Sequence, residues 1–328
     1  MDVIYREEDH EFWQKYLDDF VPAEIYDMHT HLWTEKGQED FPPDGNPLRL
    51  EIDLDALKKY SENYYPNRKC HFQLLGTPAR GMNVRNHNRF LAEECAKDPE
   101  SIAAMIVTPE TDPAEVDEGF ASGKFQSVKP YRVFAPDPAY ARITEYLPEK
   151  ILEVINHHKK AVVLHLSIPQ GADSELNQKD LQDLTKRYPN VKFVLAHCAR
   201  AFNANFLVNS IHVLKYIPNL YYDTSAVNDL YTHYLLLKHE DRARIMFGSD
   251  NVAAGGTHGK YITYADAWQF YPGAPKLEHC PSYVVPVIYE QLLQQKRAAD
   301  MLDFSADDID RLFRKSAQEF IRSLRKNL

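Results

Sequence analysis

Eight short apolar segments recur along this chain, and stretches with helical spacing of apolar residues separate them. Such an alternation predicts a parallel β-sheet covered by helices, because each strand then returns through a helix to the same side of its neighbour. Eight repeats favour an α/β fold closed into a (β/α)8 barrel. An open, doubly wound sheet is the alternative, but no strand is followed by a glycine-rich dinucleotide-binding motif. The segments are 25–31, 70–76, 102–107, 125–133, 161–167, 191–198, 220–225 and 245–250.

Further helical patterns flank these repeats. Apolar residues at helical spacing predict an N-terminal helix in residues 7–20 and two extra C-terminal helices, near 284–302 and 306–324. Ser305 and Asp308 have the spacing of a capping box at the start of the last helix. The sequence has no low-complexity segment and no linker, so we expect residues 1–328 to form one domain.

The composition narrows the classes of function. Hydrophobic residues make up 44% of the chain and charged residues 26%, as in globular proteins with a sizeable core. A net charge of −10 leaves no basic face for phosphates and argues against nucleic-acid binding. No apolar run approaches the ~20 residues of a membrane span, and the acidic N-terminus does not resemble a secretory signal.

The cysteines bear on the compartment. Four of them are widely separated and form no CxxC pair, which fits a reducing environment: Cys70, Cys95, Cys198 and Cys280. We therefore expect a cytoplasmic protein that acts on a small molecule, with neither nucleic acid nor membrane as partner. A homo-oligomer is compatible with the sequence.

Ionisable residues fall at the ends of the predicted strands. In the first strand Asp27, His29 and His31 alternate, so they would project from one face. Two imidazoles in register begin a site for zinc or a similar ion. The carboxyl ends of barrel strands meet at one mouth, and buried ionisable groups are costly unless paired or liganded. Four later strands therefore add candidates to the same site: Lys129, His165, His197 and Asp250.

Together these residues resemble the motif of the amidohydrolase superfamily. The Asp-x-His-x-His strand, Lys129, His165, Ala-His197-Cys and Gly-Ser-Asp250 carry the resemblance, which covers roughly residues 25–255. The contexts of His197 and Asp250 are most similar to its "amidohydrolase 2" branch. That branch contains metal-dependent hydrolases, lactonases and decarboxylases of small carboxylic acids.

The resemblance implies roles for individual residues. His29, His31, His165 and Asp250 match the ligands of one divalent transition-metal ion, with zinc favoured and manganese or another ion as alternatives. His197 matches a histidine that polarises the substrate or moves a proton. Asp250 would also accept a proton from water. Asp27, deeper in the strand on the same face as His29 and His31, is expected to orient a metal ligand.

Lys129 can be interpreted in two ways. In binuclear members of the superfamily the lysine at this place is carbamylated and bridges two metals. We favour an unmodified Lys129 that pairs with a substrate carboxylate, and a single metal ion. Tyr131 and Arg132 follow it, and Pro130 distorts the alternation, so the sequence does not decide which of the two faces the mouth.

Other substrate-binding candidates lie in loops after strands. Arg80 and Arg200 could bind a carboxylate through their planar guanidinium groups, although a solvated loop charge is an equal interpretation. His258, in a glycine-containing connection, is a candidate substrate contact. Asp223 is interpreted as a hydrogen-bonded structural carboxylate.

Three functions follow from this reasoning. The leading one is a metal-dependent hydrolase, in which a water activated by the metal attacks the carbonyl of a lactone, ester or amide in a small, anionic substrate. The alternative is a metal-dependent nonoxidative decarboxylase of a small carboxylic acid. A non-catalytic metal-binding barrel is the remote third, because all four expected ligands are present.

Overall fold

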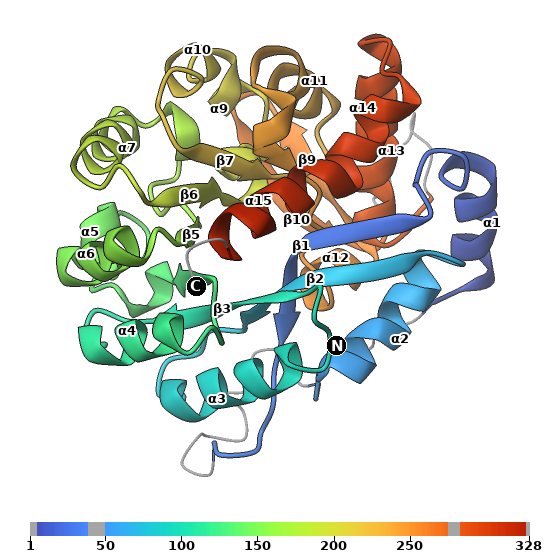
Figure 1. Ribbon diagram of the computed structural model, residues 1–328. Coiled ribbons are helices and arrows are strands. Elements are labelled where there is room, and N and C mark those ends of the chain that lie inside the picture. The colour runs from blue at the N-terminus through green and yellow to red at the C-terminus, as the bar shows by residue number, and fades with distance from the viewer. Residues whose placement is uncertain (1–4, 39–49, 275–282, 326–328) are drawn as a thin grey trace.

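Eight parallel strands form one sheet whose order follows the chain from β1 to β8, as in a (β/α)8 barrel (Figure 1). The structure is a computed structural model that describes residues 5–38, 50–274 and 283–325. The strands are β1 (Glu24–Leu32), β2 (Lys69–Gly76), β3 (Ile102–Val107), β4 (Ser127–Pro130), β5 (Ala161–Leu164), β6 (Lys192–Leu195), β7 (Leu220–Asp223) and β8 (Ile245–Met246).

The chain after β8 closes the barrel against β1. The Met28 amide donates to the Phe247 carbonyl at 2.9 Å, and the Asp250 amide donates to the His29 carbonyl at 2.8 Å. One residue further, Thr30 and Asn251 form a parallel bridge. These contacts place Asp250 directly beside the two histidines of β1.

Helices between the strands cover the outside of the barrel (Figure 1). Side-chain caps begin several of them, as at Asp53, Asp112 and Asp229, whose carboxylates accept backbone amides of the first turn. These helices are α2 (Leu54–Tyr64), α3 (Val84–Cys95), α4 (Pro113–Ala121), α5 (Ile143–Tyr146), α6 (Glu149–His158), α7 (Glu175–Arg187), α9 (Asn205–Val208), α10 (Ile211–Leu214) and α11 (Leu230–His239). The short element α8 (Ala196–Arg200), which follows β6, is a left-handed turn.

Further helices precede β1 or follow β8 in the sequence. Those flanking the barrel are α1 (Glu7–Tyr16), α12 (Ala253–Gly256), α13 (Val287–Met301), α14 (Ala306–Asp310) and α15 (Ser316–Arg325). The Ser305–Asp308 capping box is confirmed at the start of α14. In the part of the chain that the structure describes, no helix is both long and apolar enough to cross a bilayer.

α15 lies across the amino-terminal end of the barrel (Figure 1). Its apolar residues Phe320, Ile321 and Leu324 belong to one buried cluster with the strand residues Met28 and Val163, which fill the lower barrel. Lys160 fixes the helix end, since its buried ammonium group donates to the Leu324 carbonyl at 2.7 Å. This end of the barrel is therefore a packed core.

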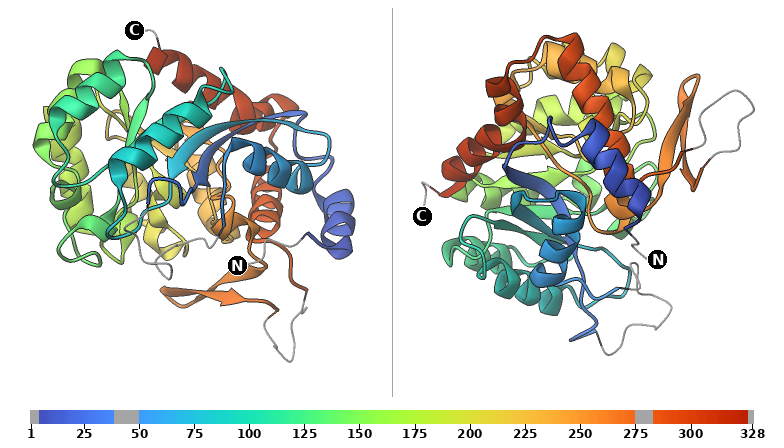
Figure 2. Two further views of the ribbon diagram at one scale, coloured as in Figure 1. Left: turned by 90° about the horizontal axis from the view of Figure 1, so that it is seen from below. Right: turned by 90° about the vertical axis from the view of Figure 1, so that its right-hand side faces the viewer.

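The structure corrects several predicted boundaries. Strands β5, β6 and β8 end at Leu164, Leu195 and Met246, so His165, His197 and Asp250 lie just beyond them. The helix predicted near 204–216 is divided into α9 and α10. The connection after β8 contains a hairpin, β9 (Gly259–Tyr264) and β10 (Ala267–Pro272), where no regular structure was expected. In Figure 2 this hairpin projects from the end opposite α15.

Candidate metal centre

His29, His31 and Asp250 converge at the carboxyl end of the strands. One ligand atom from each lies within 4.8 Å of the others. Nε2 of His31 is 3.1 Å from Oδ1 of Asp250, and Nε2 of His29 is 3.5 Å from the same oxygen. The sequence predicted these three residues as ligands of one ion, and the structure brings them together.

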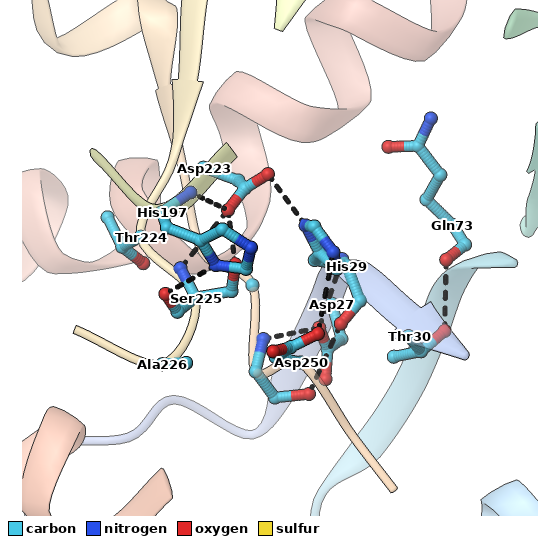
Figure 3. A network of polar contacts seen from close by, with 12 residues as sticks. Asp27, His29, Thr30, Gln73, His197, Asp223, Thr224, Ser225, Ala226 and Asp250 are labelled. Atoms are coloured by element: carbon cyan, nitrogen blue, oxygen red, sulfur yellow. Dashed lines mark hydrogen bonds and ion pairs between the residues drawn. The ribbon is translucent and has the colours of Figure 1, made fainter. Parts of the chain in front are cut away.

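A distortion in β1 positions the two histidines. The pairing of β1 with β2 shifts register between Asp27 and Thr30, so one extra residue is accommodated there. The Thr30 hydroxyl turns to the neighbouring strand and donates to the Gln73 carbonyl at 2.9 Å (Figure 3). β1 is therefore not the regular alternating strand that the sequence predicted.

Gly248 allows the chain after β8 to approach this strand. A Cβ atom at this position would lie 2.9 Å from the His29 Cβ and 3.4 Å from the Asp223 Cβ. Any larger residue would push the segment that bears Asp250 away from His29. The glycine of the Gly-Ser-Asp motif is thus explained by close packing.

Asp223, at the end of β7, orients His29 (Figure 3). Its Oδ2 lies 2.8 Å from His29 Nδ1, and both side chains are buried. A carboxylate can only accept, so Nδ1 of His29 carries the proton and Nε2 keeps a lone pair for a metal. Burial alone would raise the pKa of Asp223, but the adjacent His29 holds it well below its ordinary value. The acid therefore stays ionised.

Asp27 was expected to orient a metal ligand, but Asp223 orients the ring of His29 instead. Asp27 accepts backbone amides instead, from Ser249 at 2.9 Å and from His29 at 3.3 Å. It therefore holds the two chain segments that bear the ligands. The sequence signal for Asp223 was its place at the end of a strand, which was the same signal that identified His165 and His197.

His197 lies between His29 and His165. Its ring centroid is 4.9 Å from that of His29 and 5.1 Å from that of His165. Nδ1 of His197 donates to the Ser225 carbonyl at 3.1 Å, which leaves Nε2 free to meet a ligand. Burial lowers the pKa of His197 to about 4, so the ring is neutral near pH 7.

The backbone around His197 is strained. Four consecutive residues from His197 to Arg200 have φ between 51° and 61°, in the left-handed region that residues with a Cβ avoid. Asp223 supports the turn by accepting the His197 amide at 3.1 Å. Strain of this kind persists where surrounding contacts fix the backbone, and it concentrates at functional sites.

His165 lies beside this group but outside the converging trio. Its Nδ1 donates to the Leu166 carbonyl at 2.9 Å, so Nε2 keeps a lone pair. Burial and nearby positive charge hold its pKa well below the ordinary value. His165 as the fourth metal ligand therefore stays a prediction.

The donor set of the trio fits a divalent metal ion. Burial lowers the pKa of His29, so its ring is available in the neutral form that binds metals. Burial alone would raise the pKa of Asp250, but the His31 contact and the neighbouring histidines hold it well below its ordinary value. Neutral nitrogens with an ionised carboxylate are the ligands that zinc and related ions take.

Lys129, near the end of β4, is a buried cation in this mouth. Its side chain is 1% exposed, and burial lowers its pKa to about 8 although Asp223 and Asp250 oppose the shift. Its ammonium group is 5.2 Å from the centre of the Tyr131 ring. Among the described residues, no carboxylate forms an ion pair with it.

Tyr131 and Arg132 both lie near the mouth. The Tyr131 hydroxyl is 3.5 Å from Nδ1 of His31 and donates to the Gly76 carbonyl. Arg132 begins the short 3₁₀ helix η2 (Arg132–Phe134), and its Nη1 donates to the Pro138 carbonyl at 2.7 Å. The structure thus gives each of them a place that the sequence left open.

The other predicted substrate contacts have different surroundings. Arg200 is 9% exposed, and its Nη1 donates to the carbonyls of Leu166, Ser167 and Ile168. Arg80 is exposed and donates to the Val133 carbonyl at 3.0 Å. Nε2 of His258 lies 2.9 Å from Oδ2 of the buried Asp9, so the ring holds α1 and does not lie with the trio.

An aromatic group borders His197. The Phe202 ring centroid is 5.3 Å from that of His197, 4.6 Å from that of Tyr261 and 4.5 Å from that of Trp268. The latter two residues come from the β9–β10 hairpin. We call Phe202, Tyr261 and Trp268 the aromatic wall; the sequence did not single it out, because the hairpin was not predicted.

A (β/α)8 barrel with a His-His-Asp cluster at its carboxyl end defines a class of metal-dependent enzymes. The family model Amidohydrolase (Amidohydro_2) matches residues 26–322, and the chain belongs to this family. A search of curated proteins finds no significant match.

Solved structures with the same fold include enzymes of several activities. 4-Oxalomesaconate hydratase from Rhodopseudomonas palustris is 16% identical, with a TM-score of 0.58 over 92% of this chain and 97% of that one. An amidohydrolase from Burkholderia multivorans with bound zinc is 13% identical, with a TM-score of 0.59 over 92% and 99%. A dihydroxybenzoic acid decarboxylase from Polaromonas sp. JS666, with manganese and 2-nitroresorcinol, is 17% identical, with a TM-score of 0.57 over 94% and 99%.

Proposed function

We propose that this protein is a metal-dependent hydrolase that adds water to the carbonyl of a lactone, ester or amide in a small organic anion. The observation that carries the proposal is the convergence of His29, His31 and ionised Asp250 beside a buried lysine that has no acidic partner among the described residues. A cation buried in this way needs a counter-charge, and an anionic substrate supplies one.

The proposed metal is zinc, with manganese as the alternative, held by His29, His31, Asp250 and His165. When bound, such an ion polarises a carbonyl and lowers the pKa of water. Asp250, which its neighbours keep ionised, accepts the proton that the attacking water gives up. Asp223 keeps the His29 ring in the orientation that presents Nε2 to the mouth.

His197 and Lys129 act on the substrate itself. Nδ1 of His197 is engaged by Ser225, so Nε2 is the atom that hydrogen-bonds the carbonyl oxygen or passes a proton to the leaving group. Lys129 pairs with a substrate carboxylate and thereby orients the carbonyl. A cytoplasmic location and a homo-oligomeric state, both expected from the sequence, stay predictions.

A second function has one observation in its favour. The aromatic wall against His197 suits a planar ring, because aromatic faces pack well against one another. Nonoxidative decarboxylation of an aromatic acid would use the same metal ligands and the same lysine. Decarboxylases of dihydroxybenzoates share this fold.

The direction of proton exchange distinguishes the two reactions. Hydrolysis of a neutral lactone or ester releases acid, whereas decarboxylation consumes a proton and releases carbon dioxide. We would offer zinc- and manganese-loaded protein a panel of lactones, esters and aromatic acids in a pH-stat with a carbon dioxide sensor. Acid release (alkali added by the pH-stat) that is lost in His197→Ala supports hydrolysis. Release of carbon dioxide with proton consumption (acid added by the pH-stat) replaces it by decarboxylation.

Measurement of bound metal in the purified protein tests the proposal. Purified protein that retains no divalent ion and gains neither stability nor activity from added zinc or manganese contradicts both functions. Intact mass also tests the lysine: 44 Da of extra mass on Lys129 with two ions per chain would indicate the carbamylated, binuclear form.

A further inference from the structure

Two arginines beside the metal centre lack an acidic partner within residues 5–38, 50–274 and 283–325. The described residues place no carboxylate within ion-pair distance of the half-buried Arg132 or the buried Arg200, whereas even the exposed Arg142 is paired, with Asp180. The chain is acidic overall, with a net charge of −10, so partners are abundant. Two cations left unpaired near the mouth therefore indicate a site for an anion.

Arg200 is only partly satisfied by the protein. Nη1 donates to three successive carbonyls, including that of Ile168 at 2.8 Å, but the buried Nε has no hydrogen-bond partner in the part of the chain that the structure describes. The left-handed turn from His197 to Arg200 and the loop after β5 fix this guanidinium in place. A rigid, buried guanidinium with an unused N–H is ready to bind an oxygen ligand.

Arg132 approaches the same point from β4. Its Nη1 donates to the Pro138 carbonyl, which also accepts the Ser167 hydroxyl at 2.9 Å. The carbonyl of that same Ser167 accepts from Arg200. One serine thus connects the supports of both arginines, and the positive charge of Arg132 acts on Arg200 and lowers its pKa beyond the effect of burial.

This arginine pair lies next to the metal centre on the side of β5. The carbonyls that hold Arg200 directly follow His165, and the charges of both arginines act on the His165 ring. His165 in turn packs against His197. The pair is therefore a neighbour of the proposed reaction site, where Lys129 of β4 is a third cation that acts on the His165 ring.

We propose that Arg132 and Arg200 form a second anion subsite, so that the substrate is a dicarboxylate: one carboxylate binds at Lys129 and the metal centre, the other at the arginine pair. The inference rests on the proposed function for the first carboxylate. A planar carboxylate matches the fork of a guanidinium, and two guanidiniums can hold its two oxygens.

Binding of inert acids tests this subsite directly. We would measure dissociation constants by calorimetry for isophthalate against benzoate, and for glutarate against butyrate, with zinc-loaded and with metal-free protein. We expect each dicarboxylate to bind about tenfold or more tightly than its matched monocarboxylate. The preference should persist in metal-free protein, because neither arginine depends on the ion.

Variants assign the preference to the pair. Arg132→Gln, at a half-buried position with one carbonyl contact, should lose the dicarboxylate preference and leave monocarboxylate binding unchanged. Arg200→Lys keeps the charge but removes the fork and should weaken dicarboxylates in the same way. Arg85→Gln removes an exposed arginine paired with Glu115 and is the matched control. Circular dichroism checks that each variant is folded.

The outcomes separate this inference from the proposed function. Equal affinity of wild-type protein for mono- and dicarboxylates, or equal weakening of both by Arg132→Gln, overturns the subsite. A dicarboxylate preference in a protein that neither hydrolyses nor decarboxylates any substrate leaves the subsite standing and removes the proposed reaction. Hydrolysis by a protein that shows no dicarboxylate preference removes the subsite and leaves the proposed reaction standing.

Discussion

The Asp223–His29 contact shows how a single buried acid can prepare a metal ligand. The carboxylate fixes which imidazole nitrogen is protonated, and it also holds the His197 amide and the Ser225 hydroxyl. Asp223→Asn keeps the size of the side chain but removes its charge. We expect metal affinity to fall roughly 10- to 100-fold, measured by competition with a chelator.

The control for this variant is Asp117→Asn. Asp117 is an exposed acid that also pairs with a histidine, His158, and neither residue is a predicted metal ligand. It should leave metal affinity unchanged. Unaltered affinity in folded Asp223→Asn would show that the acid has only a structural role.

Lys129 makes a prediction about pH. Its pKa is about 8 in the folded protein because of burial, against about 10.4 in the unfolded chain. The unfolded state holds the proton more tightly, so burial costs stability in full below about pH 8, and the cost fades as pH rises from about 8 to about 10. Lys129→Met should therefore stabilise the metal-free protein by about 3 kcal/mol at pH 7, while activity falls.

Urea unfolding of chelator-treated protein at pH 7 and pH 10 measures this effect. The advantage of the Met variant should shrink at the higher pH, since wild-type Lys129 is then neutral in the folded state. An advantage of equal size at both values would mean that packing, not charge, is responsible.

At the scale of elements, the hairpin over the mouth is attached through α1. His258 precedes β9, and its ring lies 2.9 Å from Asp9 of α1, whose carboxylate is fully buried. The aromatic wall depends on this attachment, because β9 and β10 supply two of its three rings. Figure 2 shows how far the hairpin extends from the barrel.

His258→Phe leaves Asp9 buried without its partner, which is more costly than the loss of the contact alone. We expect cleavage by trypsin within 259–272 to become faster, while the midpoint of global unfolding changes much less. His212→Phe, at an exposed histidine of α10, is the comparison. Unchanged cleavage in the His258 variant would show that the hairpin is held by other contacts.

For the whole molecule, the repeat pattern was sufficient to predict the barrel. Eight apolar runs separated by helices required a parallel sheet, and the structure confirms both the number and the order of the strands. The strand ends were predicted too far along, because apolar runs continue past the last ladder hydrogen bond. The hairpin was missed since Gly255, Gly256 and Gly259 favour a loop when packing partners are unknown.

The site was predictable where a histidine or an acidic residue lies at the end of a predicted strand. His29, His31 and Asp250 met that condition and converge as expected. Asp223 also met it, but a carboxylate that binds a metal and one that orients a ligand look the same in sequence. Arg200 was a candidate carboxylate ligand from the sequence, but its pairing with Arg132 could not be predicted, because only the folded structure shows that the two lie together without acidic partners among the described residues.

The two ends of the barrel have separate tasks, and one substitution can test that division. Phe320 of α15 is buried among strand residues, and α15 lies at the end of the barrel opposite the hairpin (Figure 2). Phe320→Ala removes a large side chain from a packed core, so we expect a loss of about 3–5 kcal/mol in unfolding free energy. Because the metal ligands lie at the other end, the metal content of the folded protein should be unchanged.

Urea unfolding and elemental analysis of the same preparation measure both quantities, with Ser323→Ala, near the end of the same helix, as the milder control. A fall in metal content that parallels the loss of stability would mean that the packing at the amino-terminal end and the metal site at the mouth are coupled. Intact metal binding in a weakened barrel would show that the amino-terminal end provides stability and the carboxyl end the chemistry.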